Sequence, residues 1–224
     1  MKSDVELRRD VEDELAAEPS LDATAIGVAI QEGVVTLSGH AGSYAEKLVA
    51  EHCAARVEGV RAVASEIDIR LAGGGRVTDE DIARASLNAL AWNSMVPPNR
   101  IKLEVTSGWI TLEGNVDWHY QKAAAHDAVC HLRGVTGVTN KIGLKCTNMR
   151  NAVKAHVEAA LRRHFGERLP HIQIETRGDH VVLRGSVRSL FERNEVERAA
   201  WTTPGVCHVD NNLAVVHRAE ALTR

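Results

Sequence analysis

The sequence lacks the segments that would direct a protein out of the cytoplasm or anchor it in a membrane. Its N-terminus carries charges every few residues and has no apolar core of the kind found in signal peptides. No window approaches the ~18 consecutive apolar residues that a transmembrane helix needs. We therefore expect a cytoplasmic protein without a transmembrane segment.

Cysteine is scarce, and its spacing matches neither a disulfide framework nor a zinc motif. The chain has four cysteines and no C-x-x-C pair. The best metal candidates are Cys130-His131 and Cys207-His208, because thiolate and imidazole both suit zinc or copper. Adjacent side chains diverge on a helix or a strand, however. We expect reduced, partly buried thiols, no metal site and no cofactor.

Catalytic and nucleic-acid-binding signatures are also missing. The chain has no H-E-x-x-H, G-x-S-x-G or Walker motif, and the glycine-rich stretch at 72–76 lacks the Lys-Ser/Thr of a phosphate loop, which favours a linker. The formal net charge of −3 does not suit a protein that must neutralise phosphates along nucleic acid. We expect neither an enzyme nor a nucleic-acid-binding protein.

The sequence does contain a threefold repeat. The stretch GVVTLSG at 33–39 recurs as GWITLEG at 108–114 and as DHVVLRG at 179–185, at offsets of 75 and 71 residues. In every copy a Gly-Val pair follows 20 residues after the closing glycine. The glycines that mark the repeat are Gly39, Gly59, Gly114, Gly134, Gly185 and Gly205. The repeat predicts units at 1–72, 77–146 and 148–217 and a tail at 218–224.

Hydrophobic periodicity predicts the same elements in each unit. Apolar residues at helical spacing predict an opening helix, and period-2 runs around a glycine turn predict a hairpin. A second helix is expected at 43–57, 118–132 and 189–202, with the glycine of the Gly-Val pair as its C′ residue and a third strand after it. The residues expected on the inner face of the opening helices are Leu7, Val11, Leu15, Ile82, Leu87, Leu90, Val153, Val157 and Leu161. The predicted fold is α+β: three tandem α-β-β-α-β two-layer units, each a three-stranded sheet with two helices on one face.

The hairpin pattern G-x-V/I-x-L-x-G and the later G-V-x-x-V-x-N-x-I/L resemble the BON domain, a bacterial module of osmotically inducible and envelope-associated proteins. The asparagine of the second pattern is present as Asn140 and Asn211, whereas the first unit has Ser65. The resemblance implies a non-enzymatic, stress-related binding module, and in some relatives it implies binding to anionic phospholipid.

Aromatic residues make up only 4% of the chain, and three of the four tryptophans, Trp92, Trp109 and Trp118, fall in the middle unit. Alternation places Trp109 on the open sheet face, where we expect a neighbouring unit or a partner to cover it. Trp118, His119, Tyr120 and Lys122 form an aromatic and basic cluster at the start of a helix, which suits a bilayer interface with anionic lipid. Two alternatives remain for this cluster, namely burial in the core and contact with a protein.

The leading hypothesis is therefore a stress-related scaffolding or binding protein that associates with anionic phospholipid surfaces through the Trp118 region. Two alternatives stay open, namely a chaperone-like or protein-scaffolding role in osmotic stress, and the binding of a small cation or metal. The oligomeric state does not follow from the sequence.

Overall fold

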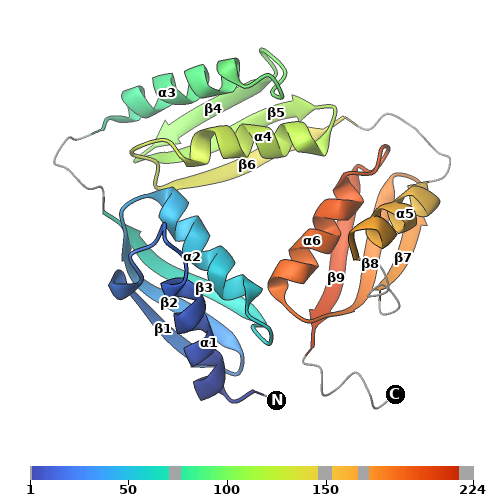
Figure 1. Cartoon of the computed structure of the whole chain (residues 1–224). Helices are drawn as coiled ribbons and strands as arrows, with labels where there is room; N and C mark the ends of the chain where they lie inside the picture. Colours follow the sequence, from blue (N-terminus) through green and yellow to red (C-terminus); the bar gives the residue numbers. More distant parts are fainter. Residues whose placement is uncertain (1, 71–76, 146–152, 166–171, 217–224) are drawn as a thin grey trace. The chain divides into compact units, whose positions relative to one another are not determined.

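The computed structural model describes residues 2–70, 77–145, 153–165 and 172–216 (Figure 1). It contains three consecutive units with the element order α-β-β-α-β, so the predicted α+β fold and its threefold repetition are confirmed. We call them the first, second and third repeats. The predicted linker at 72–76, Cys146 and the tail at 218–224 lie outside the described residues.

The helices and strands have closely matching lengths in the three repeats. The first repeat consists of α1 (Asp4–Ala16), the 3-10 helix η1 (Ala23–Ala25), β1 (Ile26–Gln31), β2 (Val34–Ala41), α2 (Tyr44–Arg56) and β3 (Ala62–Ile69). The second consists of α3 (Asp79–Trp92), β4 (Ile101–Thr106), β5 (Trp109–Val116), α4 (His119–Cys130) and β6 (Gly137–Leu144). The third consists of α5 (Val153–Phe165), β7 (Ile172–Arg177), β8 (His180–Val187), α6 (Leu190–Trp201) and β9 (His208–Val215).

Each repeat has its own three-stranded sheet, in which the second strand of the hairpin is central. In the second repeat β5 pairs antiparallel with β4 and parallel with β6. Two helices cover one face of each sheet (Figure 1). On β5 the side chains of Ile110 and Leu112 point into the layer between sheet and helices and are fully buried. Because strand side chains alternate, Trp109, Thr111 and Glu113 lie on the other face.

One predicted core position in the second repeat is wrong. The buried face of α3 is formed by Ile82, Ser86 and Leu90, which are spaced four residues apart, whereas Leu87 is 56% exposed. Leu87 is hydrophobic and lies one position from the buried face, and it was therefore assigned to the core in place of Ser86. Ser86 is fully buried, and its hydroxyl makes no hydrogen bond among the described residues.

The role predicted for the Gly-Val glycine is also wrong. Gly59 and Gly134 lie three and four residues beyond the last helical residues, Arg56 and Cys130, so they are not C′ residues. Each occupies the third position of a β-turn. The turn is closed by a hydrogen bond of 3.3 Å from the N–H of the following valine to the carbonyl of Val57 or Leu132, and the φ angles of the two glycines are 101° and 92°. A positive φ at this position is the requirement of a type II turn, which explains the glycine.

Contacts of the β4–β5 turn show at which end of the second repeat each helix and strand begins. At the start of α3, the Asp79 carboxylate accepts hydrogen bonds from the backbone N–H groups of Ser107 and Gly108 in the β4–β5 turn, both at 2.8 Å. α3 has 14 residues and is therefore about 21 Å long at ~1.5 Å per residue. Its C-terminal end thus lies at the opposite end of the sheet, where β4 begins, β5 ends and α4 begins. We call this end of the second repeat the tip.

Candidate functional site

Four large apolar or aromatic side chains are exposed at the tip. They come from the end of α3 and the turn after it and from the start of α4: Trp92 (89% exposed), Met95 (58%), Trp118 (42%) and Tyr120 (53%). The side-chain amide of Asn93 donates to the Ala124 carbonyl at 3.4 Å and ties the end of α3 to the first turns of α4. Trp118 and Tyr120 are thus surface residues, and their burial in the core, one of the alternatives above, is excluded.

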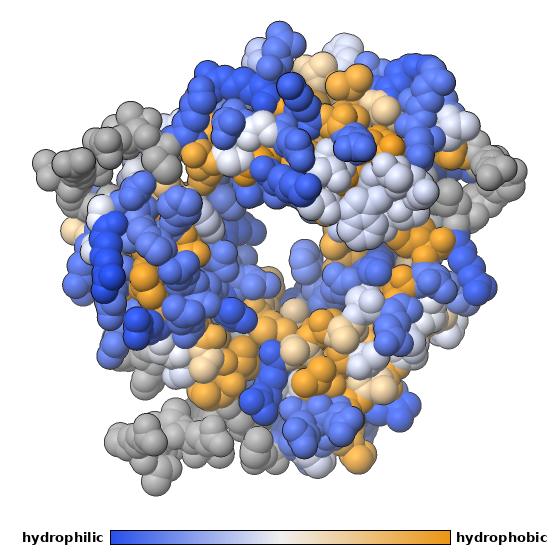
Figure 2. Space-filling model, turned by 180° about the vertical axis from the view of Figure 1, so that it is seen from behind, coloured by the Kyte–Doolittle hydropathy of each residue, from blue (hydrophilic) through white to orange (hydrophobic). Residues whose placement is uncertain are grey.

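Apolar residues also occur among hydrophilic ones on the face of the molecule that Figure 2 shows. Scattered apolar residues of this kind are usual on protein surfaces. Large aromatic side chains gathered at one end of a small domain are less usual, and exposed patches of that kind mark interaction sites.

Trp118 occupies a position that serine fills in the other two repeats. The Ser43 and Ser189 hydroxyls accept hydrogen bonds from the backbone N–H groups three residues on, at 3.2 and 3.1 Å, and so cap α2 and α6. Trp118 is the N-cap of α4 and makes no such bond, because an indole has no acceptor. Loss of a serine cap typically costs about 1 kcal/mol. The second repeat thus has a tryptophan where a stabilising residue is available.

The charge at the start of α4 also differs. The Gln121 side-chain oxygen accepts hydrogen bonds from the N–H groups of Asp117 and Trp118, at 3.0 and 3.1 Å. The corresponding residues of the other repeats are Glu46 and Glu192, which accept from backbone N–H groups in the same way. A neutral amide in place of a carboxylate leaves the positive end of the α4 dipole less compensated.

A shallow groove of about 450 Å³ runs across the open sheet face beside the tip. Its lining residues are Asn99, Arg100, Lys102, Glu113, Gly114, Asn115 and Lys145. Three of them are cations. Arg100 pairs with Asp117 at 2.7 Å, and Glu113, the one acid in the lining, lies 3.6 Å from Lys141. The groove lining therefore has a net positive charge, and the groove lies at the same end of the repeat as the exposed aromatic side chains.

Lys122 differs from its counterparts in its hydrogen bonding. Lys47 and Arg193 donate to third-strand carbonyls, those of Ile67 at 3.2 Å and Asn211 at 3.0 Å. The Lys122 ammonium has no hydrogen bond or ion pair to any described residue, and partial burial lowers the pKa of Lys122. A half-buried, unpaired cation is a suitable partner for an anion.

The five predicted site residues do not form one site. Trp118, His119, Tyr120 and Lys122 share the start of α4, with His119 partly buried. Trp109 lies at the other end of β5, about 23 Å from Val116 at ~3.3 Å per strand residue. Its indole N–H donates to the Thr139 hydroxyl at 2.8 Å. Its ring lies against Gly137, where an added Cβ would come within 2.4 Å of the ring. Packing of Trp109 within its own sheet was not among the expectations.

The sequence interpretation missed much of the tip. Trp92, Met95, Arg100 and Lys102 lie in the segment 92–102, which connects α3 to β4, and the fold brings Lys145, which follows β6, to the same end. One signal was available in the sequence, since Trp92 lies at the end of an amphipathic helix, where no core position is left for so large a side chain.

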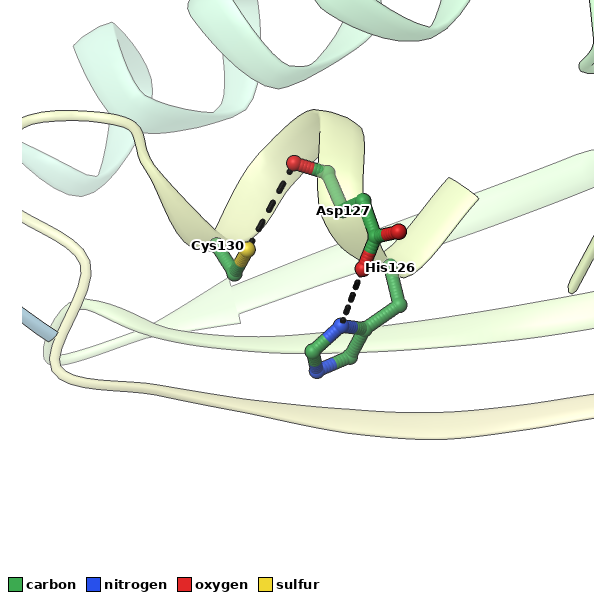
Figure 3. Close-up of side chains that lie close together, drawn as sticks. All are labelled: His126, Asp127 and Cys130. Carbon is green, nitrogen blue, oxygen red and sulfur yellow. Dashed lines mark hydrogen bonds and ion pairs between the residues drawn. The ribbon is translucent and has the colours of Figure 1, made fainter. Parts of the chain in front are cut away.

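A second group of polar side chains lies near the other end of α4. His126, Asp127 and Cys130 have potential metal-ligand atoms that all lie within 4.8 Å of one another (Figure 3). The His126 Nδ1 lies 3.4 Å from an Asp127 carboxylate oxygen, and the Cys130 thiol donates to the Asp127 backbone carbonyl at 3.4 Å. Burial, with a smaller contribution from the Asp127 charge, raises the pKa of Cys130 to about 11. His131, the neighbour considered from the sequence, is exposed and does not belong to this group.

None of the described helices combines the length and the apolar character that a bilayer span requires. Among solved structures, the chain is similar to CdsD, a structural protein of the type III secretion system of Chlamydia trachomatis, with a TM-score of 0.27 and 15% identity over 96% of this chain and 94% of that one. The PrgH periplasmic domain gives a TM-score of 0.21 and 10% identity over 91% of this chain and 98% of that one. Superpositions with such TM-scores carry no argument about fold or function.

Sequence comparison is more informative. Osmotically-inducible protein Y of Escherichia coli (strain K12) is 32% identical over 130 residues, which are 56% of this chain and 65% of that protein, a little under two thirds of its length. The BON domain model matches residues 3–70, 78–145 and 148–217. These three matches cover nearly all of the described sequence, and the chain therefore belongs to the BON domain family.

Proposed function

We propose that this protein is a non-enzymatic binding module that associates with anionic phospholipid surfaces through the tip of the second repeat. The observation that carries the proposal is the presence, on one small end of one repeat, of exposed Trp92, Trp118 and Tyr120 beside a cationic groove. Aromatic rings are stable at the level of lipid headgroups, and nearby cations are attracted to anionic lipid.

The first repeat supports this assignment by contrast. At the positions of Trp92, Met95, Trp118 and Tyr120 it has Ala17, Ser20, Ser43 and Ala45, and at those of Arg100 and Lys102 it has Ala25 and Gly27. The fold therefore does not require bulky or charged residues here. In the third repeat, Tyr120 has an exposed aromatic counterpart, Phe191, whereas the positions of Trp92 and Trp118 hold Arg163 and Ser189. The two tryptophans are thus confined to one copy, and such features are candidates for function, because structural requirements recur in every copy.

The relative supports a role in stress. Its name states that it is osmotically inducible, and neither it nor the family match indicates a catalytic activity. We extend the stress-related role to this chain as part of the proposal. The prediction of a cytoplasmic location would place the membrane contact on the inner face of the cell membrane.

The test is co-sedimentation with vesicles that contain or lack anionic phospholipid, at low and at physiological salt. A tip variant combines Trp92→Ala, Trp118→Ser and Tyr120→Ala, which are the residues of the first repeat, so that the fold is expected to tolerate them. We expect wild-type protein to bind anionic vesicles, more weakly at higher salt because of screening. The tip variant should partition about tenfold less, since loss of ~1.4 kcal/mol of interfacial burial has that effect.

Trp109→Val is the matched control, because it removes an exposed tryptophan of the same repeat at the far end of β5 and installs the residue of the first repeat, Val34. It should bind vesicles like wild type. If wild-type protein stays in the supernatant with every vesicle, or if the folded tip variant binds as well as wild type, the lipid proposal is wrong. The protein-partner alternative would then be examined by pull-down with the tip variant as the negative control.

A further inference from the structure

The side chains of His126 and Cys130 lie on the same side of α4, since residues four apart on a helix are neighbours. Asp127 adds a carboxylate beside them (Figure 3). Among the described residues, these three form the group whose potential ligand atoms all lie within 4.8 Å of one another. They belong to one continuous helix of the second repeat, so their spacing does not depend on how the repeats are arranged.

We propose that His126, Asp127 and Cys130 form a zinc-binding site on α4, with water completing the coordination. Imidazole nitrogen, thiolate sulfur and carboxylate oxygen are the protein ligands that zinc prefers, and sites with three protein ligands keep a fourth position for water. Zinc bond lengths of ~2.0–2.3 Å place neighbouring ligand atoms about 3.5 Å apart in a tetrahedron. The three ligand atoms already lie within 4.8 Å of one another, so none of their separations must shorten by more than about 1.3 Å to reach that spacing.

Exposure gives the ion a route to the site. The Asp127 side chain is 73% exposed and that of His126 is 28% exposed, whereas Cys130 is buried and only 3% exposed. Zinc can therefore arrive from solvent on the carboxylate side and meet the sulfur last. The Cys130 thiol is protonated at neutral pH, and its proton passes to solvent when the sulfur binds the ion.

The ligand set is confined to the second repeat. The residues at the positions of His126, Asp127 and Cys130 are Glu51, His52 and Ala55 in the first repeat and Glu197, Arg198 and Trp201 in the third. The fold accepts other residues at each position, so its requirements do not explain this combination. The inference is independent of the lipid proposal, because Cys130 lies twelve residues beyond Trp118, about 18 Å along the helix at ~1.5 Å per residue.

The site is tested by titration of the reduced full-length protein with Co²⁺, a spectroscopic substitute for zinc. We expect one equivalent to bind with a thiolate-to-cobalt charge-transfer band and visible bands of four-coordinate cobalt, and Zn²⁺ should abolish both. Cys130→Ala should lose the charge-transfer band and bind zinc at least tenfold more weakly. This variant has the residue of the first repeat, Ala55, and is expected to fold. His126→Gln should weaken zinc binding while leaving Cys130 in place.

The other cysteines provide matched controls. Cys53 and Cys207 are also buried thiols, and Cys53→Ser, Cys207→Ser and Cys146→Ser should each retain the charge-transfer band. Zinc should also raise the melting temperature of wild-type protein, because a ligand that binds the folded state stabilises it, and should not do so in Cys130→Ala. The absence of a charge-transfer band in wild-type protein, or its persistence in Cys130→Ala, overturns the proposal.

Discussion

The first and second repeats share a backbone but differ at the end where the opening helix stops and the second helix starts. In the first repeat this end has small residues and a serine cap, Ser43, that satisfies the Glu46 N–H. In the second it has exposed Trp92, Trp118 and Tyr120, no side-chain cap, and the cations Arg100 and Lys102. The difference separates what the fold needs from what one repeat adds to it, because the same order of helices and strands accepts either small residues with a serine cap or large exposed residues without one.

The largest effect is expected from breaking what the two repeats share. Gly39 and Gly114 have φ angles of 118° and 143°, and a Cβ on either would lie 2.1 Å from a backbone carbonyl oxygen, that of Ala25 or Arg100. Strain and overlap together should make Gly39→Ala and Gly114→Ala each cost at least about 3 kcal/mol of unfolding free energy. Chemical denaturation followed by circular dichroism measures this cost.

Gly178 in the third repeat is the control for backbone strain alone. Its φ is 68°, and an added Cβ would meet nothing within 4 Å. Gly178→Ala should therefore cost only about 1 kcal/mol. Equal costs at Gly114 and Gly178 would show that the close approach to the Arg100 carbonyl does not matter.

A smaller effect is expected at the family asparagine. The Asn140 side chain donates to the Lys122 carbonyl at 2.9 Å and accepts from the Ile142 N–H at 3.2 Å, and Asn211 makes the same two kinds of contact in the third repeat. In the first repeat Ser65 takes this position, and its buried hydroxyl has no hydrogen-bond partner among the described residues. Asn140→Ser should thus cost about 1.5 kcal/mol, since a net hydrogen bond contributes ~0.5–1.5 kcal/mol and one or both are lost.

The reverse change sharpens the comparison. Ser65→Asn should stabilise the first repeat by about 1 kcal/mol if the longer side chain reaches the Lys47 carbonyl. Thermal unfolding of both variants measures the two shifts. A destabilised Ser65→Asn would mean that the first repeat has repacked around serine, so that the two positions are not interchangeable.

The sequence predicted the repeated elements well, because hydrophobic periodicity is set by burial and each unit has the same burial. All three second helices begin and end within two residues of the predicted ranges. The prediction for Leu87 was wrong because this hydrophobic residue lies one position from the buried face of α3, which contains Ser86. The prediction for Gly59 and Gly134 was wrong because a glycine at a repeated spacing can belong either to a helix end or to a turn.

The candidate site was predictable only in part. Trp118, Tyr120 and Lys122 are close in sequence, so helix geometry alone groups them. Trp92 and the groove cations reach the tip through the chain topology, and a sequence pattern does not give the distance between the end of one helix and the start of another. The grouping of His126, Asp127 and Cys130 was not predicted, because it follows from the helix geometry that brings residues four apart together and not from adjacent Cys-His pairs.

The exchange of cap residues between the two repeats tests the stability difference directly. Trp118→Ser should stabilise the second repeat by about 1 kcal/mol, because a serine hydroxyl can accept from the Gln121 N–H as Ser43 does from Glu46. Ser43→Ala should cost the first repeat a similar amount. If Trp118→Ser raises the melting temperature and Ser43→Ala lowers it, the exposed tryptophan replaces a stabilising cap in the second repeat. A destabilised Trp118→Ser would instead show that the tryptophan contributes packing that exceeds the value of the cap.

The smallest effect is expected at Lys122, where the sign can be derived from its pKa. Burial lowers the pKa of Lys122 below 10.5, so charging the ammonium is less favourable in the folded state than in the unfolded state. Below the folded pKa both states are charged and the folded state bears the full desolvation penalty, whereas above 10.5 both are neutral and the penalty is gone. Lys122→Met should therefore raise the melting temperature slightly at neutral pH, and its advantage over wild type should shrink as the pH rises through the alkaline range toward 10.5. Lys47→Met is the matched variant and should be destabilising, because the Lys47 ammonium donates to the Ile67 carbonyl and that bond would be lost. If the rise in melting temperature caused by Lys122→Met did not change with pH, the rise would come from the buried methionine side chain, and the Lys122 charge would have no measurable cost.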